Sequence, residues 1–215
     1  MNETLKRALS GAVYVGIMWF GTANEWSYPI LFGIISILCT YEIYKLRKGK
    51  SKLLAFMYVL IPFFLIQLFG ISDSDHAEKE FNPSLILFMF ILTWTFDTFA
   101  YLIGKPLGKH KIMPSVSPKK SWEGFVGGLI FTLLATYLAK DFFQFNYQDF
   151  NPYVVAAFLP FTATFGDFLE SHFKRQAGVK DSGNFIPGHG GMLDRMDAFM
   201  ITIPALYIYI NVFCT

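Results

Sequence analysis

The sequence predicts an all-α, polytopic membrane protein: a bundle of about seven transmembrane helices with a cytoplasmic N-terminus. Of the 215 residues, 53% are hydrophobic and 16% are charged, whereas a soluble domain carries about 25% charged residues. The 25 phenylalanines add apolar surface that a soluble domain of this size could not bury. Disordered chains are polar and poor in aromatic residues, so the same composition excludes disorder.

Seven apolar stretches approach the roughly 20 residues that a helix needs to cross a bilayer. In chain order they are 8–20, 28–43, 53–71, 84–103, 125–139, 152–169 and 196–213. The first stretch is short, and the basic pair Lys6-Arg7 before it and the small residues 21–23 after it also resemble a signal peptide. Trp19 and Phe20 crowd that cleavage site, so we expect the first helix to be retained.

The basic residues alternate between the segments that join these stretches. The N-terminus and the second, fourth and sixth loops contain all 18 Lys and Arg residues except Lys79 and Lys140. Basic segments stay in the cytoplasm during membrane insertion. The N-terminus and these three loops are therefore predicted on the cytoplasmic side, and the C-terminus on the opposite side.

The chain is expected to form one membrane domain over residues 1–215, because no repeat of fixed period and no linker divides it. Residues 1–83 supply the N-terminal spans, and residues 84–215 supply the spans and cytoplasmic loops that carry the chemistry. Cys39 and Cys214 form neither a disulfide framework nor a metal site, because no other Cys or His lies near either one. Nucleic acid is not an expected partner, since no basic block is interleaved with aromatic residues.

Six acidic residues stand within or beside the spans on the predicted cytoplasmic side: Asp97, Asp167, Glu170, Asp181, Asp194 and Asp197. An ionisable residue inside a span costs at least ~2.5 kcal/mol at the bilayer centre, so it faces a polar cavity or a partner. The spacing of three places Asp167 with Glu170, and Asp194 with Asp197, on one helix face each. Paired carboxylates suit a hard cation such as Mg²⁺. For Asp97 the structural alternative is a salt bridge to a loop lysine that only holds helices together.

The same side carries basic residues of the kind that bind phosphate oxygens: Lys119, Lys120, Lys174, Arg175, Lys180 and Arg195. The segment 187–191 contains three glycines and leads into the last span, so it can direct backbone N–H groups at an anion. A plain turn is the alternative for this segment and for His189 within it. Residues 121–124 are a predicted helix start. Together the acids, bases and glycines predict metal and phosphate chemistry at one membrane face.

Three motifs in the last third of the chain carry a family resemblance. SHFKR (171–175), KDSG (180–183) and PGHGGMLDRMD (187–197) resemble the signature of the phosphatidate cytidylyltransferases, also called CDP-diacylglycerol synthases. Residues 97–101, 108–109 and 117–120 resemble upstream motifs of that family. The resemblance spans roughly Trp94 to the C-terminus. Two departures stand out: family members are commonly longer, and Ala198 stands where a serine often follows the last aspartate.

The resemblance implies a nucleotidyltransferase of phospholipid biosynthesis, which transfers CMP from CTP to phosphatidate and leaves CDP-diacylglycerol and pyrophosphate. It also implies a Mg²⁺-dependent centre, of one or two ions, built from Asp167, Asp194 and Asp197. Asp97 and Glu170 are further candidate metal ligands. The expected setting is a bacterial inner membrane, with membrane lipid around the chain and the site facing the cytoplasm, because CTP is soluble and phosphatidate stays in lipid. A homodimer is compatible with this reading but does not follow from the residues.

The candidate site residues fall into three groups, which overlap. Catalytic roles are expected for Asp194, Asp197, Lys180, Asp181 and Arg195. Substrate binding is expected for Ser117, Lys119, Lys120, Lys174, Arg175, Gly188, His189, Gly190 and Gly191. Metal binding is expected for Asp167, Asp194, Asp197, Asp97 and Glu170.

Two other functions use similar features. A CTP-dependent kinase for a polyprenol would need the same metal and phosphate groups, but it would transfer the γ-phosphate and would need a base for the lipid hydroxyl. A transporter for an anionic solute would place polar residues near the middle of the membrane. Here they gather at one face, which disfavours the transporter.

Overall fold

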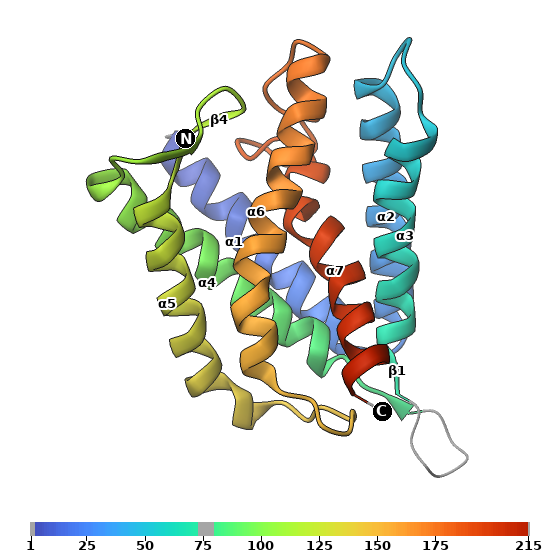
Figure 1. Cartoon of the computed structure of the whole chain (residues 1–215). Coiled ribbons are helices and arrows are strands. Elements are labelled where there is room, and N and C mark those ends of the chain that lie inside the picture. Colours follow the sequence, from blue (N-terminus) through green and yellow to red (C-terminus); the bar gives the residue numbers. More distant parts are fainter. Residues whose placement is uncertain (1–2, 73–79, 215) are drawn as a thin grey trace.

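The computed structural model describes residues 3–72 and 80–214. Seven long helices pack side by side along these ranges (Figure 1). They are α1 (Glu3–Ala23), α2 (Ser27–Leu46), α3 (Leu53–Phe69), α4 (Ser84–Leu107), α5 (Trp122–Ala139), α6 (Pro152–Gln176) and α7 (Leu193–Phe213). Each overlaps one of the predicted apolar stretches, so the all-α prediction is confirmed.

The lengths of the helices divide them into two classes. Five are long and apolar enough to cross a bilayer: α2, α4, α5 with the short 3₁₀ helix η1 (Lys140–Phe142), α6 and α7. The apolar part of α1 (Ala8–Ala23) and the whole of α3 are shorter. Apolar side chains such as Ile37, which is 70% exposed on α2, cover the outside of the bundle, where lipid replaces water. The chain is an integral membrane protein, and the span number of seven remains a prediction.

The four basic segments meet at one end of the bundle. In Figure 1 the N-terminus, the loop between α2 and α3, strand β4 and the loop between α6 and α7 lie at the same end, and the C-terminus lies at the other. This is the arrangement that alternating antiparallel helices produce. These four basic segments therefore share one end of the molecule, although the sequence separates them widely.

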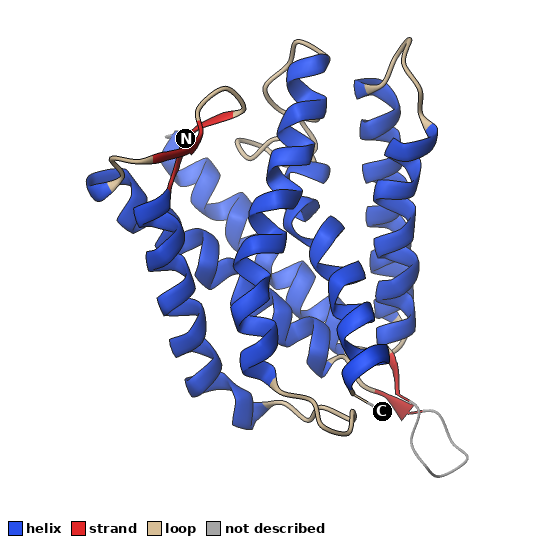
Figure 2. Cartoon of the chain, viewed as in Figure 1, coloured by secondary structure: helices blue, strands red, loops and turns tan. Residues whose placement is uncertain are grey.

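Two short antiparallel hairpins lie outside the helices and were not predicted (Figure 2). Strands β1 (Ile71–Ser72) and β2 (Glu80–Phe81) pair at the end near the C-terminus, and β3 (Lys111–Met113) pairs with β4 (Ser117–Ser121) at the other end. Strand β4 leads directly into α5, where the Ser121 hydroxyl caps the helix by accepting a hydrogen bond of 3.3 Å from the Gly124 N–H. The predicted helix start at 121–124 is thus confirmed.

The core joins the N-terminal helices to the C-terminal ones. The Phe90 ring of α4 lies between Phe32 of α2 and Phe199 of α7, with ring centroids 6.5 Å and 5.3 Å apart. All three rings are almost fully buried. Helix α4 packs most extensively on α5, and α6 packs on α7. This packing holds the facing sides of α6 and α7 together, and the charged residues lie there.

Candidate active site

Helices α6 and α7 bring three carboxylates together. Asp167 and Glu170 on α6 and Asp197 on α7 each place one oxygen within 4.8 Å of the others, and we call them the carboxylate triad. In the part of the chain that the structure describes, it is the one cluster of His, Cys, Asp or Glu with a geometry suited to a metal ion. The three-residue spacing of Asp167 and Glu170 gives them the same helix face, as the sequence predicted.

The chemistry of the triad fits a hard divalent cation. Glu170 is completely buried, and its Oε1 has no hydrogen-bonding partner among the described residues. A buried carboxylate oxygen without a donor is costly unless a cation compensates it. The three side chains offer only oxygen ligands, which Mg²⁺ prefers. The residues present therefore fit a magnesium ion.

Two lysines pair with the acids of this region. Lys120, on β4, places Nζ 2.7 Å from Asp167 Oδ2. Lys174, one turn after Glu170 on α6, forms ion pairs with Glu170 and with Asp194, where its Nζ lies 2.6 Å from Oδ1. Both lysines were predicted to bind substrate phosphate. In the structure both are paired with carboxylates, and phosphate binding by either remains a prediction.

Asp194 stands beside the triad and not within it. Its Oδ1 is paired with Lys174, and its Oδ2 accepts hydrogen bonds from the backbone N–H and hydroxyl of Ser182 and from the Gly191 N–H. These three bonds, of 2.9, 3.1 and 2.7 Å, tie the loop between α6 and α7 to the first turn of α7. Asp194 thus has polar contacts with three residues, and its role as a metal ligand remains a prediction.

The glycine segment, residues 187–191, has two glycines with positive φ angles, and some of its N–H groups donate to acceptors within the protein. Gly188 and Gly190 have φ angles of 77° and 89°, which glycine adopts without strain. Gly191 donates its N–H to Asp194, and the His189 N–H donates to the Ile186 carbonyl. Two N–H groups of this segment thus have acceptors within the protein, and its role in binding substrate stays a prediction. The N–H groups of Gly188 and Gly190 remain candidates.

Glu42 is a site residue that the sequence analysis missed. This acid of α2 is 6% exposed and accepts hydrogen bonds from the N–H groups of Met192 and Leu193, at 3.0 and 2.8 Å. It thus supplies the negative charge at the N-terminus of α7. A signal was present, because Glu42 falls inside an apolar stretch, 28–43, where an ionisable residue is costly.

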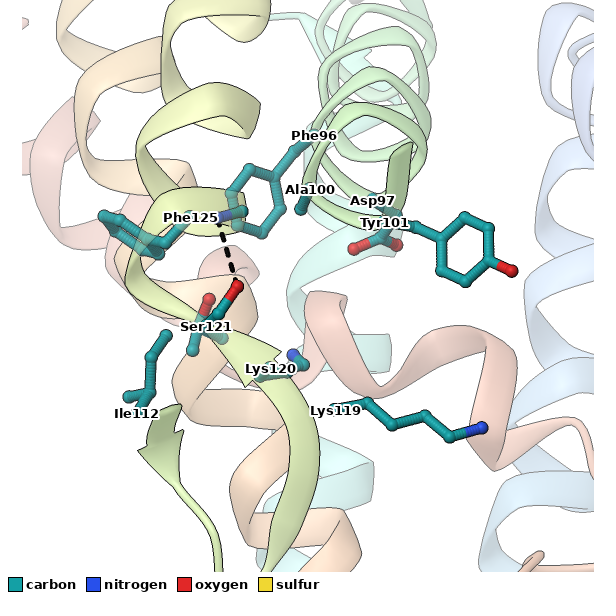
Figure 3. Close-up of a pocket in the computed structure, with 11 residues that line it drawn as sticks. Phe96, Asp97, Ala100, Tyr101, Ile112, Lys119, Lys120, Ser121 and Phe125 are labelled. Carbon is teal, nitrogen blue, oxygen red and sulfur yellow. Dashed lines mark hydrogen bonds between the residues drawn. The ribbon is translucent and has the colours of Figure 1, made fainter. Parts of the chain in front are cut away.

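A cavity of about 180 Å³ lies between α4, the β3–β4 hairpin and α5 (Figure 3). Phe96 and Phe125 lie together on one side of it, and Lys119 and Lys120 extend from the strand on the other. Asp97 of α4 also lines this cavity but does not belong to the triad. The cavity combines an apolar wall with two ammonium groups.

A second cavity, of about 230 Å³, lies between α1, α4, α7 and the glycine segment. Its polar wall contains Asp97, His189, Asp194, Arg195 and Asp197. Helix α1 closes the other side with residues that the sequence analysis did not single out, and the Ser10 hydroxyl lies 3.0 Å from His189 Nδ1. Asp97 lines both cavities, so the two spaces adjoin the same carboxylate.

The remaining predicted residues lie further out. Lys180 and Asp181 are exposed in the loop between α6 and α7, and Ser117 lies in the β3–β4 hairpin opposite Met113. The exposed guanidinium of Arg175 donates to the Val179 carbonyl, and that of Arg195 donates to the His189 carbonyl. These contacts support the loop. The structure places all five near the triad's end of the bundle; none belongs to the triad, and Arg195 also lines the second cavity.

Comparisons with known proteins all indicate the same protein family. The sequence model described as the cytidylyltransferase family matches residues 47–213. A phosphatidate cytidylyltransferase of Staphylococcus saprophyticus is 46% identical over 185 residues, which cover 86% of this chain and 70% of that protein. Proteins of the same name from Staphylococcus haemolyticus and Staphylococcus epidermidis are 46% and 43% identical, each over 93% of this chain and over 76% and 77% of their own lengths.

The matched region includes α4 to α7, the triad and both lysines that pair with it. Most of the chain is covered, and nearly half of the aligned residues are identical to those of the staphylococcal proteins. The chain belongs to the cytidylyltransferase family.

Proposed function

We propose that this protein transfers CMP from CTP to phosphatidate, which yields CDP-diacylglycerol and pyrophosphate. The observation that carries the proposal is the carboxylate triad of α6 and α7, with Lys120 and Lys174 paired to its members. Acids that fit a divalent cation and lysines that fit phosphate are the groups that nucleotidyl transfer needs. The names of the staphylococcal relatives supply the acceptor, phosphatidate.

The lipid itself can act as the nucleophile. A phosphate monoester has a second ionisation near pH 6, so phosphatidate is largely a dianion at about pH 7. One of its phosphate oxygens attacks the α-phosphorus of CTP, the bond from that phosphorus to the β-phosphate oxygen breaks, and pyrophosphate leaves. No side chain has to remove a proton from the nucleophile. The protein's task is to bring two anions together and to orient them.

Asp167, Glu170 and Asp197 are the residues that would hold Mg²⁺. A bound magnesium ion would offset the charge of the nucleotide phosphates and of the departing pyrophosphate. Lys120 and Lys174 bind phosphate oxygens and exchange their carboxylate partners for them as the substrates enter. As a ligand of a second ion, Asp194 would use a carboxylate oxygen that also contacts Lys174 or the loop.

The two cavities suit the two substrates. The cavity between Phe96, Phe125 and the lysines of β4 fits a phosphate attached to an apolar glyceride. The cavity lined by His189 and Arg195 is the more polar, and we assign it to the phosphates of CTP. Both adjoin Asp97, so the attacking and the attacked phosphate meet beside that residue and the triad.

We assign this end of the bundle to the cytoplasmic side of a bacterial inner membrane. Four basic segments gather there, and basic segments stay in the cytoplasm. CTP reaches the site from solution, and phosphatidate reaches it from the lipid without leaving the bilayer. A tag on the C-terminus should accordingly be accessible only from the outer side.

The test uses purified protein in detergent micelles with phosphatidate, Mg²⁺ and CTP labelled at either the α- or the γ-phosphate. We expect label to enter the lipid from the α-position alone. Entry from the γ-position, with a polyprenol as acceptor, would identify a kinase instead. A protein that moves neither label but takes up anions in liposomes would be a transporter and would contradict the proposal.

A further inference from the structure

Glu42 lies in a helix that carries none of the family's motifs. It stands on α2, before the region at 47–213 that matches the family, and it is buried against the loop between α6 and α7. Its Oε2 accepts hydrogen bonds from the Ser182 hydroxyl and the Leu193 N–H, both at 2.8 Å, and its Oε1 accepts one from the Met192 N–H at 3.0 Å. One side chain therefore holds both the loop and the first turn of α7.

These contacts lead directly to the acids of the site. The Ser182 hydroxyl that contacts Glu42 also lies 3.1 Å from Asp194 Oδ2. Asp194 is paired with Lys174, and Lys174 is paired with Glu170 of the triad. A continuous series of polar contacts thus runs from α2 to the triad. A displacement of the Glu42 side chain would therefore displace Asp194 and Lys174, although Glu42 contacts no substrate.

The loop backbone at Gly191 packs closely against the Glu42 carboxylate. A Cβ atom on Gly191 would overlap the Ser182 hydroxyl and approach both carboxylate oxygens of Glu42. The loop therefore packs directly against the carboxylate, and its backbone N–H groups reach it without an intervening side chain. This close fit is what a fixed loop position requires.

We propose that Glu42 is a positioning residue for cytidylyl transfer: it fixes the loop between α6 and α7, and through Ser182 and Asp194 it sets the place of Lys174 beside the triad. The proposal rests on the proposed function for its kinetic consequence. Its structural part, the fixing of the loop, stands on the hydrogen bonds alone. Glu42 itself touches neither substrate nor metal.

The substitution Glu42→Gln tests this role because it changes hydrogen-bonding capacity at nearly constant volume. All three partners of Glu42 donate, and both of its carboxylate oxygens are used as acceptors. Glutamine has only one acceptor oxygen, and its amide NH₂ would face at least one of these donors. The variant must therefore lose at least one of the three hydrogen bonds, whereas α2 and its packing remain.

The experiment measures steady-state kinetics and backbone hydrogen exchange on the same detergent-purified protein. Loss of a residue that orients metal-site groups typically costs about 10- to 100-fold in activity. We expect kcat of Glu42→Gln to fall by that factor, with KM for CTP and phosphatidate changed less than about threefold. We also expect faster amide exchange in residues 182–193, with no change in α5.

Two control variants separate positioning from general effects. Glu25→Gln makes the same chemical change at an exposed acid between α1 and α2, and Cys39→Ala alters another buried residue of α2, one turn before Glu42. Both should keep kcat within about threefold of the unsubstituted protein and leave exchange in 182–193 unchanged.

The proposal is overturned if Glu42→Gln keeps normal kcat, or if exchange in 182–193 does not change. It is also overturned if Cys39→Ala, at a matched thermal midpoint, loses as much activity as Glu42→Gln. Should the unsubstituted protein transfer no CMP, the proposed function fails, and the exchange experiment still decides whether Glu42 fixes the loop.

Discussion

The helices α1–α3 and α4–α7 contribute to the site in different ways. The later helices, together with strand β4 between α4 and α5, supply the triad, both paired lysines and most residues of the two cavities. The earlier helices supply single polar contacts: Ser10 reaches the glycine segment, Glu42 holds the start of α7, and the Tyr58 hydroxyl donates to the Gly166 carbonyl at 3.1 Å. We expect the first group to carry out the chemistry and the second to fix its position.

This difference explains why the sequence of α4–α7 contains recognisable motifs, whereas that of α1–α3 contains none. Most of the candidate metal and phosphate ligands are charged, and some recur at helical spacing, as Asp167 and Glu170 do, so they form a visible motif. A positioning contact needs one hydrogen-bonding atom in an otherwise apolar helix.

Asp197→Asn should cause the largest loss. Asparagine keeps the volume but removes a charge from the triad, and a metal ion supplies several kcal/mol of charge stabilisation, so turnover should fall at least about a thousandfold. The thermal midpoint should stay close to that of the unsubstituted protein. CMP transfer and thermal unfolding in detergent measure the two quantities. Near-normal transfer would remove Asp197 from the metal site.

Lys120→Met should cause the next largest loss. It removes a charge that pairs with Asp167 and that lines the cavity of Figure 3. We expect kcat/KM to fall about 100-fold, which corresponds to about 3 kcal/mol for a charge-assisted contact. Lys48→Met, at an exposed lysine of the loop between α2 and α3, is the matched control and should change kcat/KM less than about twofold. Equal losses in both variants would point to overall charge and not to a site.

Ser10→Ala tests the contribution of α1. The variant loses the hydroxyl that donates to the Pro187 carbonyl at 2.9 Å and lies beside His189. One hydrogen bond is worth about 1 kcal/mol, so activity should fall about three- to tenfold. A kinetic measurement over a range of CTP concentrations checks this. A loss as large as that of Lys120→Met would place α1 within the chemical site and would break the division between the two parts.

Tyr58→Phe should have the smallest effect on activity. It removes the bond from α3 to the Gly166 carbonyl, at a cost of about 1 kcal/mol of stability. The thermal midpoint should fall by about 2–4 °C, with CMP transfer changed less than about twofold. Gly166 precedes Asp167 in the chain, so a tenfold loss of transfer at an unchanged midpoint would show that α3 also positions the triad.

Much of the fold was predictable, because membrane helices leave a strong signal. Six of the seven apolar stretches lie within a helix, and the other, 53–71, runs past the end of α3 into β1. The Ser121 cap was visible from the residues at 121–124. The two hairpins were not predicted, since segments such as 111–121 contain lysine, proline and serine and no alternating apolar pattern. Short strands of this kind depend on the helices that hold their ends.

The candidate site was predictable in its charged members and not in their pairing. The spacing of Asp167 and Glu170 indicated a shared face, and the structure gives them one. That Lys174 pairs with Asp194, and that Glu42 caps α7, depends on how helices far apart in sequence pack together. A single acid such as Glu42 has no partner at helical spacing. Only the free-energy cost of an ionisable residue within a membrane span could have indicated that it has a role.

The most direct test of the account is the binding of Mn²⁺, as a probe for Mg²⁺, to the purified protein by electron paramagnetic resonance. We assign the metal to Asp167, Glu170 and Asp197, and Asp97 lies outside this triad. Asp197→Asn should therefore lose the bound-manganese signal, whereas Asp97→Asn should keep it. Mn²⁺ binding that survives in Asp197→Asn but disappears in Asp97→Asn would contradict this assignment. It would place the metal at Asp97, between the two cavities.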